Sequence, residues 1–236
     1  LNGLEKLEYR GYDSAGIAII NSETKKLVCN KAEGKLKYLK NIVKNTEIHG
    51  TVGIGHTRWA THGKPDVKNA HPHIDSSGKV AVVQNGIIEN YQELKNKLEK
   101  EGVVFNSDTD TEVIPHLIQK ELFALSQLNL EDNGSTLLVA VRNVISDLEG
   151  SYALAVLWSG APDSLVVARK QAPLIIGLGE GEFICASDTP AIANFTKIIL
   201  PLEDEEIALL TPLGIEIYDS TNARQYRNPI SLQIAE

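Results

Sequence analysis

The chain has 236 residues, of which 42% are hydrophobic and 23% are charged, values typical of a globular protein that buries a sizeable core. Its formal net charge of -8 argues against a nucleic-acid-binding surface, which needs clustered Lys and Arg. The two cysteines, Cys29 and Cys185, form no disulfide framework, and neither a membrane-length apolar run nor a signal-peptide pattern is present. We therefore expect a cytoplasmic protein that binds neither nucleic acid nor membrane.

The first part of the chain predicts a helix end followed by strands. Residues 1–7 carry Leu at every third position and lack an N-cap, and the chain contains no Met, so we expect that an upstream segment has been removed. Apolar runs predict strands over residues 15–20, 27–30, 51–57 and 79–83. The last of these strands is expected to end at Asn85-Gly86.

Helical spacing predicts helices over residues 35–45, 90–101, 109–128 and 136–148. The expected N-caps are Asn90 for the second helix, Thr109 with Glu112 in a capping box for the third, and Ser135 for the fourth. Pro115 lies beyond the first turn of the third helix, so it predicts a kink or a later start.

The last part of the chain is rich in short strands with period-2 alternation, which favours antiparallel pairing. The predicted strands are residues 152–158, 164–169, 174–177, 182–186, 198–201, 206–210 and 215–219, with a short helical turn over residues 190–195. Because strands and helices come in blocks, the fold class is α+β. Residues 1–221 form one predicted domain, and residues 222–236 read as a linker toward a further domain.

Polar side chains gather in two segments that favour a binding site. Residues 57–63 put Arg, Trp, Thr and His on one glycine-terminated loop, and Arg offers a fork for a carboxylate. Asn85-Gly86 can present a side-chain amide beside a backbone N–H, as an oxyanion hole requires, although the dipeptide is also a favoured turn. His56, His62, His71 and His73 lack the partners of a zinc site, so we expect no metal.

Six segments in the same order resemble the N-terminal glutaminase domain of the glutamine–fructose-6-phosphate aminotransferase family, also called glucosamine-6-phosphate synthases. They are residues 10–16 (RGYDSAG), 56–63 (HTRWATHG), 69–73 (NAHPH), 85–90 (NGIIEN), 107–112 (SDTDTE) and 183–188 (FICASD). The resemblance covers essentially the whole chain. It implies an N-terminal-nucleophile fold, a four-layer αββα sandwich with two antiparallel sheets.

The resemblance also implies a site. Asn85 and Gly86 would form the oxyanion hole, and Arg58 and Asp110 would hold the α-carboxylate and α-ammonium of L-glutamine. Thr61, His62 and His71 would line the same pocket, Trp59 would close over it, and Arg10 and Gly11 would support the nucleophile. No cofactor or metal is implied. The implied partners are L-glutamine and a sugar-isomerase domain of the same full-length chain, and a homodimer is left open.

The chain departs from this family in two respects. The family's nucleophile is an N-terminal Cys, which is absent here together with its strand, so the fragment is expected to be inactive alone. Gln84 stands where many relatives have His, with little expected effect. Two alternatives stay open: a non-catalytic glutamine-binding or interface module, and the glutaminase domain of another class II amidotransferase.

Overall fold

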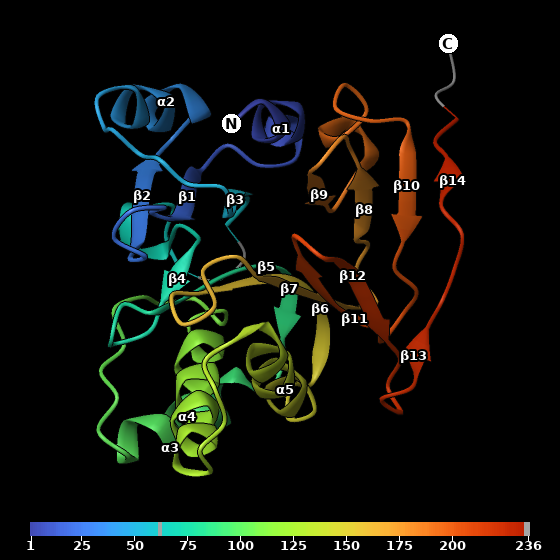
Figure 1. Cartoon of the computed structure of the whole chain (residues 1–236). Coiled ribbons are helices and arrows are strands. Elements are labelled where there is room, and N and C mark those ends of the chain that lie inside the picture. The colour runs from blue at the N-terminus through green and yellow to red at the C-terminus, as the bar shows by residue number, and fades with distance from the viewer. Residues whose placement is uncertain (61–62, 234–236) are drawn as a thin grey trace.

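The computed structural model describes residues 1–60 and 63–233. Two layers of β-sheet lie face to face between two layers of helices (Figure 1). Neighbouring strands within the sheets pair antiparallel throughout these described residues. The α+β class and the αββα layering agree with the prediction.

The larger sheet has seven strands in the order β13-β12-β11-β7-β6-β5-β4. Its central strands are buried on both faces, which explains why β6 reads as an almost continuous apolar run: Leu154 and Val156 face one core, and Ala153 and Leu157 face the other. The strands are β4 (His73–Ile74), β5 (Val80–Ile88), β6 (Gly150–Trp158), β7 (Leu165–Lys170), β11 (Ile207–Thr211), β12 (Gly214–Tyr218) and β13 (Arg224–Gln225).

The second sheet layer consists of two smaller sheets rather than one. A three-stranded sheet has the order β2-β1-β3, and a four-stranded sheet has the order β14-β10-β8-β9. Their strands are β1 (Ser14–Ile20), β2 (Leu27–Glu33), β3 (Gly53–Arg58), β8 (Ile175–Leu178), β9 (Phe183–Ala186), β10 (Ile198–Pro201) and β14 (Ile230–Ser231). In Figure 1 the two sheets stand side by side above the seven-stranded sheet.

Three helices cover the lower face of the seven-stranded sheet: α3 (Tyr91–Lys100), α4 (Val113–Gln127) and α5 (Gly134–Ile145) (Figure 1). Their apolar faces, including Ile114 and Leu137, form the largest core with that sheet. The upper layer contains α1 (Asn2–Leu7) and α2 (Leu36–Lys44). The short 3-10 turns are η1 (Glu8–Arg10), η2 (Val67–Asn69) and η3 (Thr189–Ala191). No helix among the described residues is long and apolar enough to cross a membrane.

Several local predictions at element ends are wrong. The strand β5 does not end at Asn85-Gly86 but continues to Ile88, because Asn85 to Ile88 stay in register with β6. The Asn90 side chain does not cap α3; it donates to the Asp147 carbonyl and accepts from the Glu149 N–H, linking two loops.

The helix starts also differ. The helix α4 begins at Val113, which places Pro115 in its first turn, and this is the later start that Pro115 predicted. Glu112 therefore forms no capping box with Thr109; its carboxylate accepts from the backbone of Asn106 and Ser107 and bonds His116. The N-cap of α5 is Asn133, which accepts from the Thr136 N–H, and not Ser135.

The segment expected as a linker contains two short strands. Arg224–Gln225 pairs with β12, and Ile230–Ser231 pairs with β10. Arg227 adds an ion pair with the buried carboxylate of Glu206. Residues 222–231 therefore lie against both sheet layers, and where the domain ends stays a prediction.

Candidate functional site

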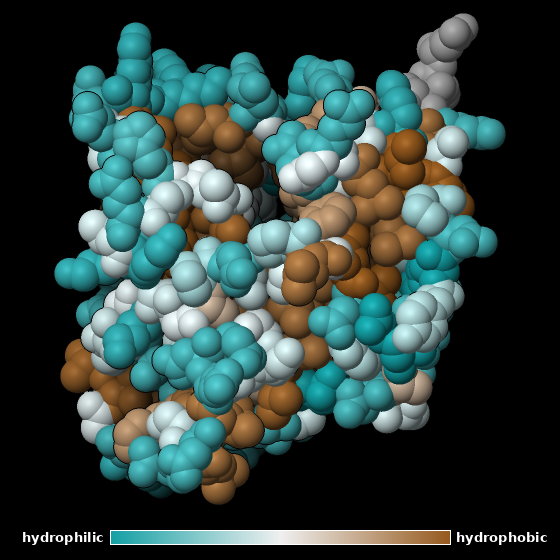
Figure 2. All heavy atoms as spheres, in the orientation of Figure 1, coloured by the Kyte–Doolittle hydropathy of each residue, from teal (hydrophilic) through white to brown (hydrophobic). Residues whose placement is uncertain are grey.

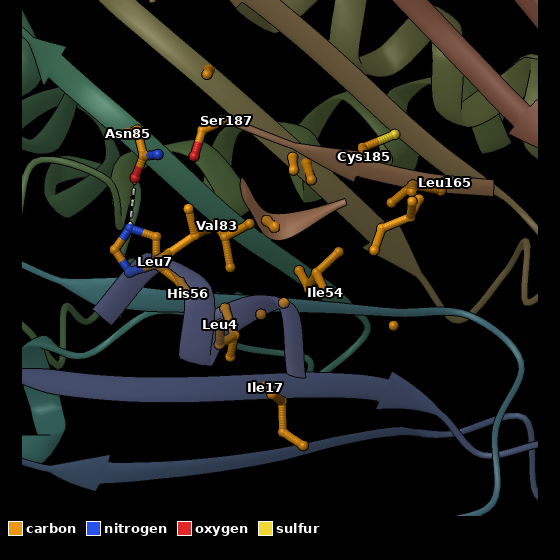
Figure 3. Close-up of a pocket in the computed structure, with 18 of the residues that line it drawn as sticks. Leu4, Leu7, Ile17, Ile54, His56, Val83, Asn85, Leu165, Cys185 and Ser187 are labelled. Carbon is orange, nitrogen blue, oxygen red and sulfur yellow. Dashed lines mark hydrogen bonds between the residues drawn. The ribbon is translucent and has the colours of Figure 1, made fainter. Parts of the chain in front are cut away.

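Two cavities meet between the sheet layers. The larger, of about 480 Å³, is mainly apolar and lies between the edges of β3 and β9. The smaller, of about 280 Å³, is polar. Four residues line both cavities and mark their junction: His56, Gln84, Asn85 and Ser187. Figure 2 shows a hollow in the surface between the parts of the molecule that contain the β2-β1-β3 sheet and the β14-β10-β8-β9 sheet. Figure 3 shows the junction, with His56, Asn85 and Ser187 on one side of the apolar residues.

The structure brings most of the predicted site residues together around the polar cavity. Those that line it are Arg10, Arg58, Trp59, His71, Asn85, Gly86 and Asp110. Gly11 lies just behind: a Cβ there would be 2.7 Å from the Arg58 carbonyl carbon, so glycine lets this segment pack on the β3 end. Thr61 and His62 lie outside the described residues. Because these residues come from distant segments, their common location is a result of the fold.

Arg58 ends β3 and is only 3% exposed. Its guanidinium donates to the Lys64 carbonyl at 2.9 Å and to the Gly63 carbonyl at 3.3 Å. Burial lowers the pKa of Arg58, although a guanidinium stays protonated in proteins. The side chain thus brings a fixed positive charge to the cavity and also holds the following loop.

Asp110 supplies the opposite charge in the same cavity. It is 4% exposed, and its Oδ2 accepts from the Ile88 N–H at 2.8 Å. This bond ties Asp110 to the end of β5, two residues beyond Gly86. An ionised carboxylate has about four acceptor positions, so one backbone bond leaves capacity for a cationic group.

Asn85 and Gly86 lie inside β5 rather than at a turn. Gly86 has a φ of +121°, and a Cβ there would be 2.2 Å from the Ser151 carbonyl oxygen, so the position requires glycine. The Asn85 Oδ1 lies 2.9 Å from His56 Nε2 across the space between the sheet layers. The amide nitrogen of Asn85 points away from His56, toward the side of Ser187 (Figure 3).

Three histidines form a column beside Asn85, with His71 and His73 buried and His56 partly buried. The rings of His56 and His71 stack at 4.0 Å, and those of His71 and His73 lie 4.8 Å apart. Burial lowers the pKa of His56 to about 4 and lowers the pKa of His71 and His73 well below the usual value. The column is therefore neutral near pH 7. Within the described residues, no group of three or more His, Cys, Asp or Glu could hold a metal ion.

This column predicts acid sensitivity. His71 and His73 stay neutral in the folded protein, whereas in the unfolded chain they take up protons below about pH 6.5. The free energy of unfolding should therefore fall as pH drops below about 6.5, by up to about 1.4 kcal/mol per pH unit for each histidine. Urea unfolding between pH 7.5 and pH 5 measures this slope. His73→Gln should reduce the dependence of the unfolding free energy on pH by up to about 1.4 kcal/mol per pH unit. An unchanged dependence would contradict a neutral buried His73.

The rim of the polar cavity includes Trp59, which is 58% exposed and packs edge-on against Tyr12 at 5.8 Å. Asp13 holds the next residue by accepting from the Ala60 N–H at 2.7 Å. Trp59 thus lies at the mouth of the polar cavity, and its role as a cover stays a prediction.

Sequence reasoning missed several lining residues. Ser187 receives a hydrogen bond from Arg10 at 2.5 Å, and Arg10 also lies 3.8 Å from Asp188, whose carboxylate accepts from the Tyr9 hydroxyl. Ser187 and Asp188 belong to one of the family-like segments, so that segment was the available signal. Pro173, Thr109 and Thr111 also line the cavity. Thr109 and Thr111 lie in another such segment, whereas Pro173 carried no signal.

Comparison with known proteins identifies the family of the chain. A family described as "Glutamine amidotransferase domain" matches residues 56–194. Glutamine–fructose-6-phosphate aminotransferase (isomerizing) of Thermosynechococcus vestitus is 55% identical over 98% of this chain and 36% of its own length. The enzyme of the same name from a Nostoc species is 54% identical over 99% of this chain and 36% of its own length. The chain thus spans about 36% of the relatives it matches.

A similar fold is known from solved structures. Glutamine phosphoribosylpyrophosphate amidotransferase from B. subtilis, complexed with ADP and GMP, superposes with a TM-score of 0.76 and 28% identity. The match covers 93% of this chain and 45% of that chain. The expected N-terminal-nucleophile type of fold is confirmed by this likeness.

Proposed function

This chain belongs to the glutamine amidotransferase domain family, and we propose that it hydrolyses the side-chain amide of L-glutamine as one domain of a longer enzyme. One observation carries the proposal. The polar cavity holds a buried cation, Arg58, and a buried carboxylate, Asp110, together with the Asn85-Gly86 pair. These groups match the two charged ends of an α-amino acid and the carbonyl of its amide.

The junction of the two cavities gives the substrate a direction. Arg58 and Asp110 line the polar cavity, whereas Asn85 lines both cavities. The amino-acid end of glutamine would thus lie in the polar cavity and its amide at the junction. There the Asn85 side-chain N–H and the Gly86 backbone N–H would stabilise the negative charge that develops on the amide oxygen.

The apolar cavity has the shape and lining for a β-strand that carries the nucleophile. Among the described strands, β3 pairs with β1 alone and β9 pairs with β8 alone, so both have an open edge beside this cavity. Val83 and Ala155 of the seven-stranded sheet form its floor. A strand bound here would join the two smaller sheets, and its end could reach Asn85 and Ser187 at the junction.

The proposed occupant is the N-terminal segment, beginning with Cys, that the resemblance implies. The α-amino group, with an ordinary pKa of about 7.7–8.0, would take the proton from the thiol, the resulting thiolate would attack the amide carbon, and the amino group would then pass that proton to the departing nitrogen. The C–N bond breaks, ammonia leaves and a thioester remains. Water then hydrolyses the thioester to glutamate and restores the thiol.

The names of the relatives suggest where the ammonia goes. We propose that it is transferred to fructose 6-phosphate in a sugar-isomerase domain of the same polypeptide, giving glucosamine 6-phosphate. Residues 1–221 would form the glutaminase domain and residues 222–236 would lead to the second domain. The cysteine usage favours a cytoplasmic location. Whether the enzyme is a homodimer is open.

A direct test uses the cysteine-extended chain, defined as this chain preceded by the N-terminal segment, beginning with Cys, that the resemblance implies. It should release glutamate from L-glutamine but not from D-glutamine. In the complete polypeptide, adding fructose 6-phosphate should yield glucosamine 6-phosphate. An extended chain that folds and binds glutamine without hydrolysing it would support a non-catalytic glutamine-binding module. Hydrolysis without amination of fructose 6-phosphate would indicate a different class II amidotransferase.

Arg58→Lys in the cysteine-extended chain should raise KM for glutamine with a smaller change in kcat. A lysine ammonium cannot replace the two-pronged contact of a guanidinium with a carboxylate. Losing a charge-assisted bond costs on the order of 1.5–3 kcal/mol, or roughly 10- to 150-fold in KM. Since Arg58 also holds the Gly63 and Lys64 carbonyls, thermal unfolding should be measured alongside. An unchanged KM in a folded variant would remove Arg58 from the carboxylate site.

A further inference from the structure

The orientation of the Asn85 amide depends on one neighbour. His56 on β3 and Asn85 on β5 belong to different sheet layers, and their side chains meet with His56 Nε2 2.9 Å from Asn85 Oδ1. An amide oxygen can only accept a hydrogen bond, so His56 Nε2 must carry the proton. The Asn85 NH2 group is thereby directed away from His56 (Figure 3).

This direction matters because the side-chain amide has an NH2 group that donates hydrogen bonds and an oxygen that accepts them. With Oδ1 on His56, the NH2 group of Asn85 faces the junction of the cavities. A half-turn about the last side-chain bond would place Oδ1 there instead. An oxygen lone pair would then face the developing oxyanion and destabilise it. A donor is useful to the reaction only if this second orientation is suppressed beforehand.

The surroundings of His56 fix the orientation of its ring and keep it neutral, with its N–H toward Asn85. The His71 ring stacks on it at 4.0 Å with an interplanar angle of 12°, and His71 Nδ1 accepts from the Gln84 N–H, next to Asn85. Burial lowers the pKa of His56 to about 4, so the imidazole is neutral near pH 7. A neutral ring carries one N–H. His56 Nδ1 is buried and has no hydrogen-bond partner among the described residues, so a proton there would be an unsatisfied donor, and the N–H belongs on Nε2, facing Asn85 Oδ1.

We propose that His56 is a positioning residue that holds the Asn85 amide with its NH2 group toward the reaction centre. The inference rests on the proposed glutamine hydrolysis. It adds a residue at the cavity junction whose contact with Asn85 determines whether the oxyanion donor points toward the amide oxygen. His56 therefore acts on the transition state through Asn85 and not on substrate binding.

The test compares two replacements in the cysteine-extended chain. His56→Phe keeps a ring that can stack on His71 but removes the N–H, and it should lower kcat for glutamate release roughly tenfold with KM nearly unchanged, the loss expected for one hydrogen bond. His56→Gln places an amide N–H at the reach of Nε2 and should recover most of kcat. A parental kcat in folded His56→Phe overturns the proposal, as does a loss in His56→Gln as large as in His56→Phe.

A double-mutant cycle separates positioning from a general structural effect. In the Asn85→Ala background, His56→Phe should change kcat by less than about twofold, because the group that it orients is gone. Multiplicative losses would overturn the proposal. If His56→Phe fails to fold, His56→Leu takes its place in the same cycle. A parent without glutamate release would contradict the proposed function instead, so the two failures are distinguishable.

Discussion

Replacing Asn85 by Ala in the cysteine-extended chain should lower kcat for glutamate release by roughly 10²–10³-fold, the range for loss of one oxyanion donor. The KM for glutamine should change little, because the negative charge that Asn85 stabilises develops on the amide oxygen mainly in the transition state. Steady-state kinetics with glutamate detection measures both values. Thermal unfolding of the variant shows whether the fold is kept, since Asn85 pairs with Ala153 inside the sheet.

Asp110→Asn is the matched control for binding. The substrate ammonium is the same in the ground and transition states, so this change should raise KM more than it lowers kcat. The variant also keeps an acceptor for the Ile88 N–H, which limits structural damage. A well-folded Asn85→Ala protein with near-parental kcat would refute the oxyanion assignment. A modest fall in activity in proportion to lost stability would indicate that Asn85-Gly86 has only a structural role.

The 236-residue chain without the cysteine-bearing segment should release no glutamate above a buffer blank. Burial raises the pKa of Cys29 to about 11 and that of Cys185 to about 12, so neither thiol is a usable nucleophile near pH 8. Adding the segment should create the activity. Changing its first Cys to Ala should abolish it, since loss of a hydrolase nucleophile costs roughly 10⁶-fold.

Cys29→Ala together with Cys185→Ala in the extended chain provides the control. This pair should keep activity within about twofold if neither thiol takes part in the reaction. If the unextended chain shows turnover, and the same two substitutions made in that chain abolish it, one of these two cysteines is the nucleophile. That result would overturn the assignment of the nucleophile to an N-terminal segment.

The element types could be predicted from the sequence because periodicity reports burial directly. The apolar run of β6 has the length of a strand and is bounded by glycine and serine on both sides, which is the sequence signal of a strand buried on both faces. In the structure Leu154 and Val156 pack on one face of the sheet, and Ala153 and Leu157 on the other. The helix α2 likewise follows from apolar residues at helical spacing, with Leu36 and Leu39 buried. These signals are local, so a single segment suffices to find them.

The element ends could not be predicted, because tertiary contacts override local preference there. Asn-Gly favours a turn, yet pairing with β6 keeps Asn85-Gly86 within a strand, where Gly86 adopts a positive φ that other residues rarely adopt. Thr109 and Glu112 have capping-box spacing, but Glu112 is taken up by the backbone of Asn106 and Ser107. In both cases a hydrogen-bond partner outside the motif determined the local structure.

For the site, too, local sequence signals indicated part of the answer and the fold determined the rest. The residue types pointed to carboxylate and oxyanion recognition, and the resemblance supplied the roles. Without the resemblance, the residue pattern did not indicate that Arg58, Asp110 and Asn85 line one cavity, because they come from β3, a loop and β5. Nor did it indicate the stacked histidines that hold Asn85, since ring stacking depends on the approach of two sheet layers.

The most direct test of the account is a structure of the cysteine-extended chain with its Cys changed to Ala and L-glutamine bound. We predict the α-carboxylate at Arg58, the α-ammonium at Asp110, and the amide oxygen within hydrogen-bond distance of Asn85 Nδ2 and the Gly86 N–H. Glutamine bound outside this cavity, or reversed with its side-chain amide against Asp110, would contradict it.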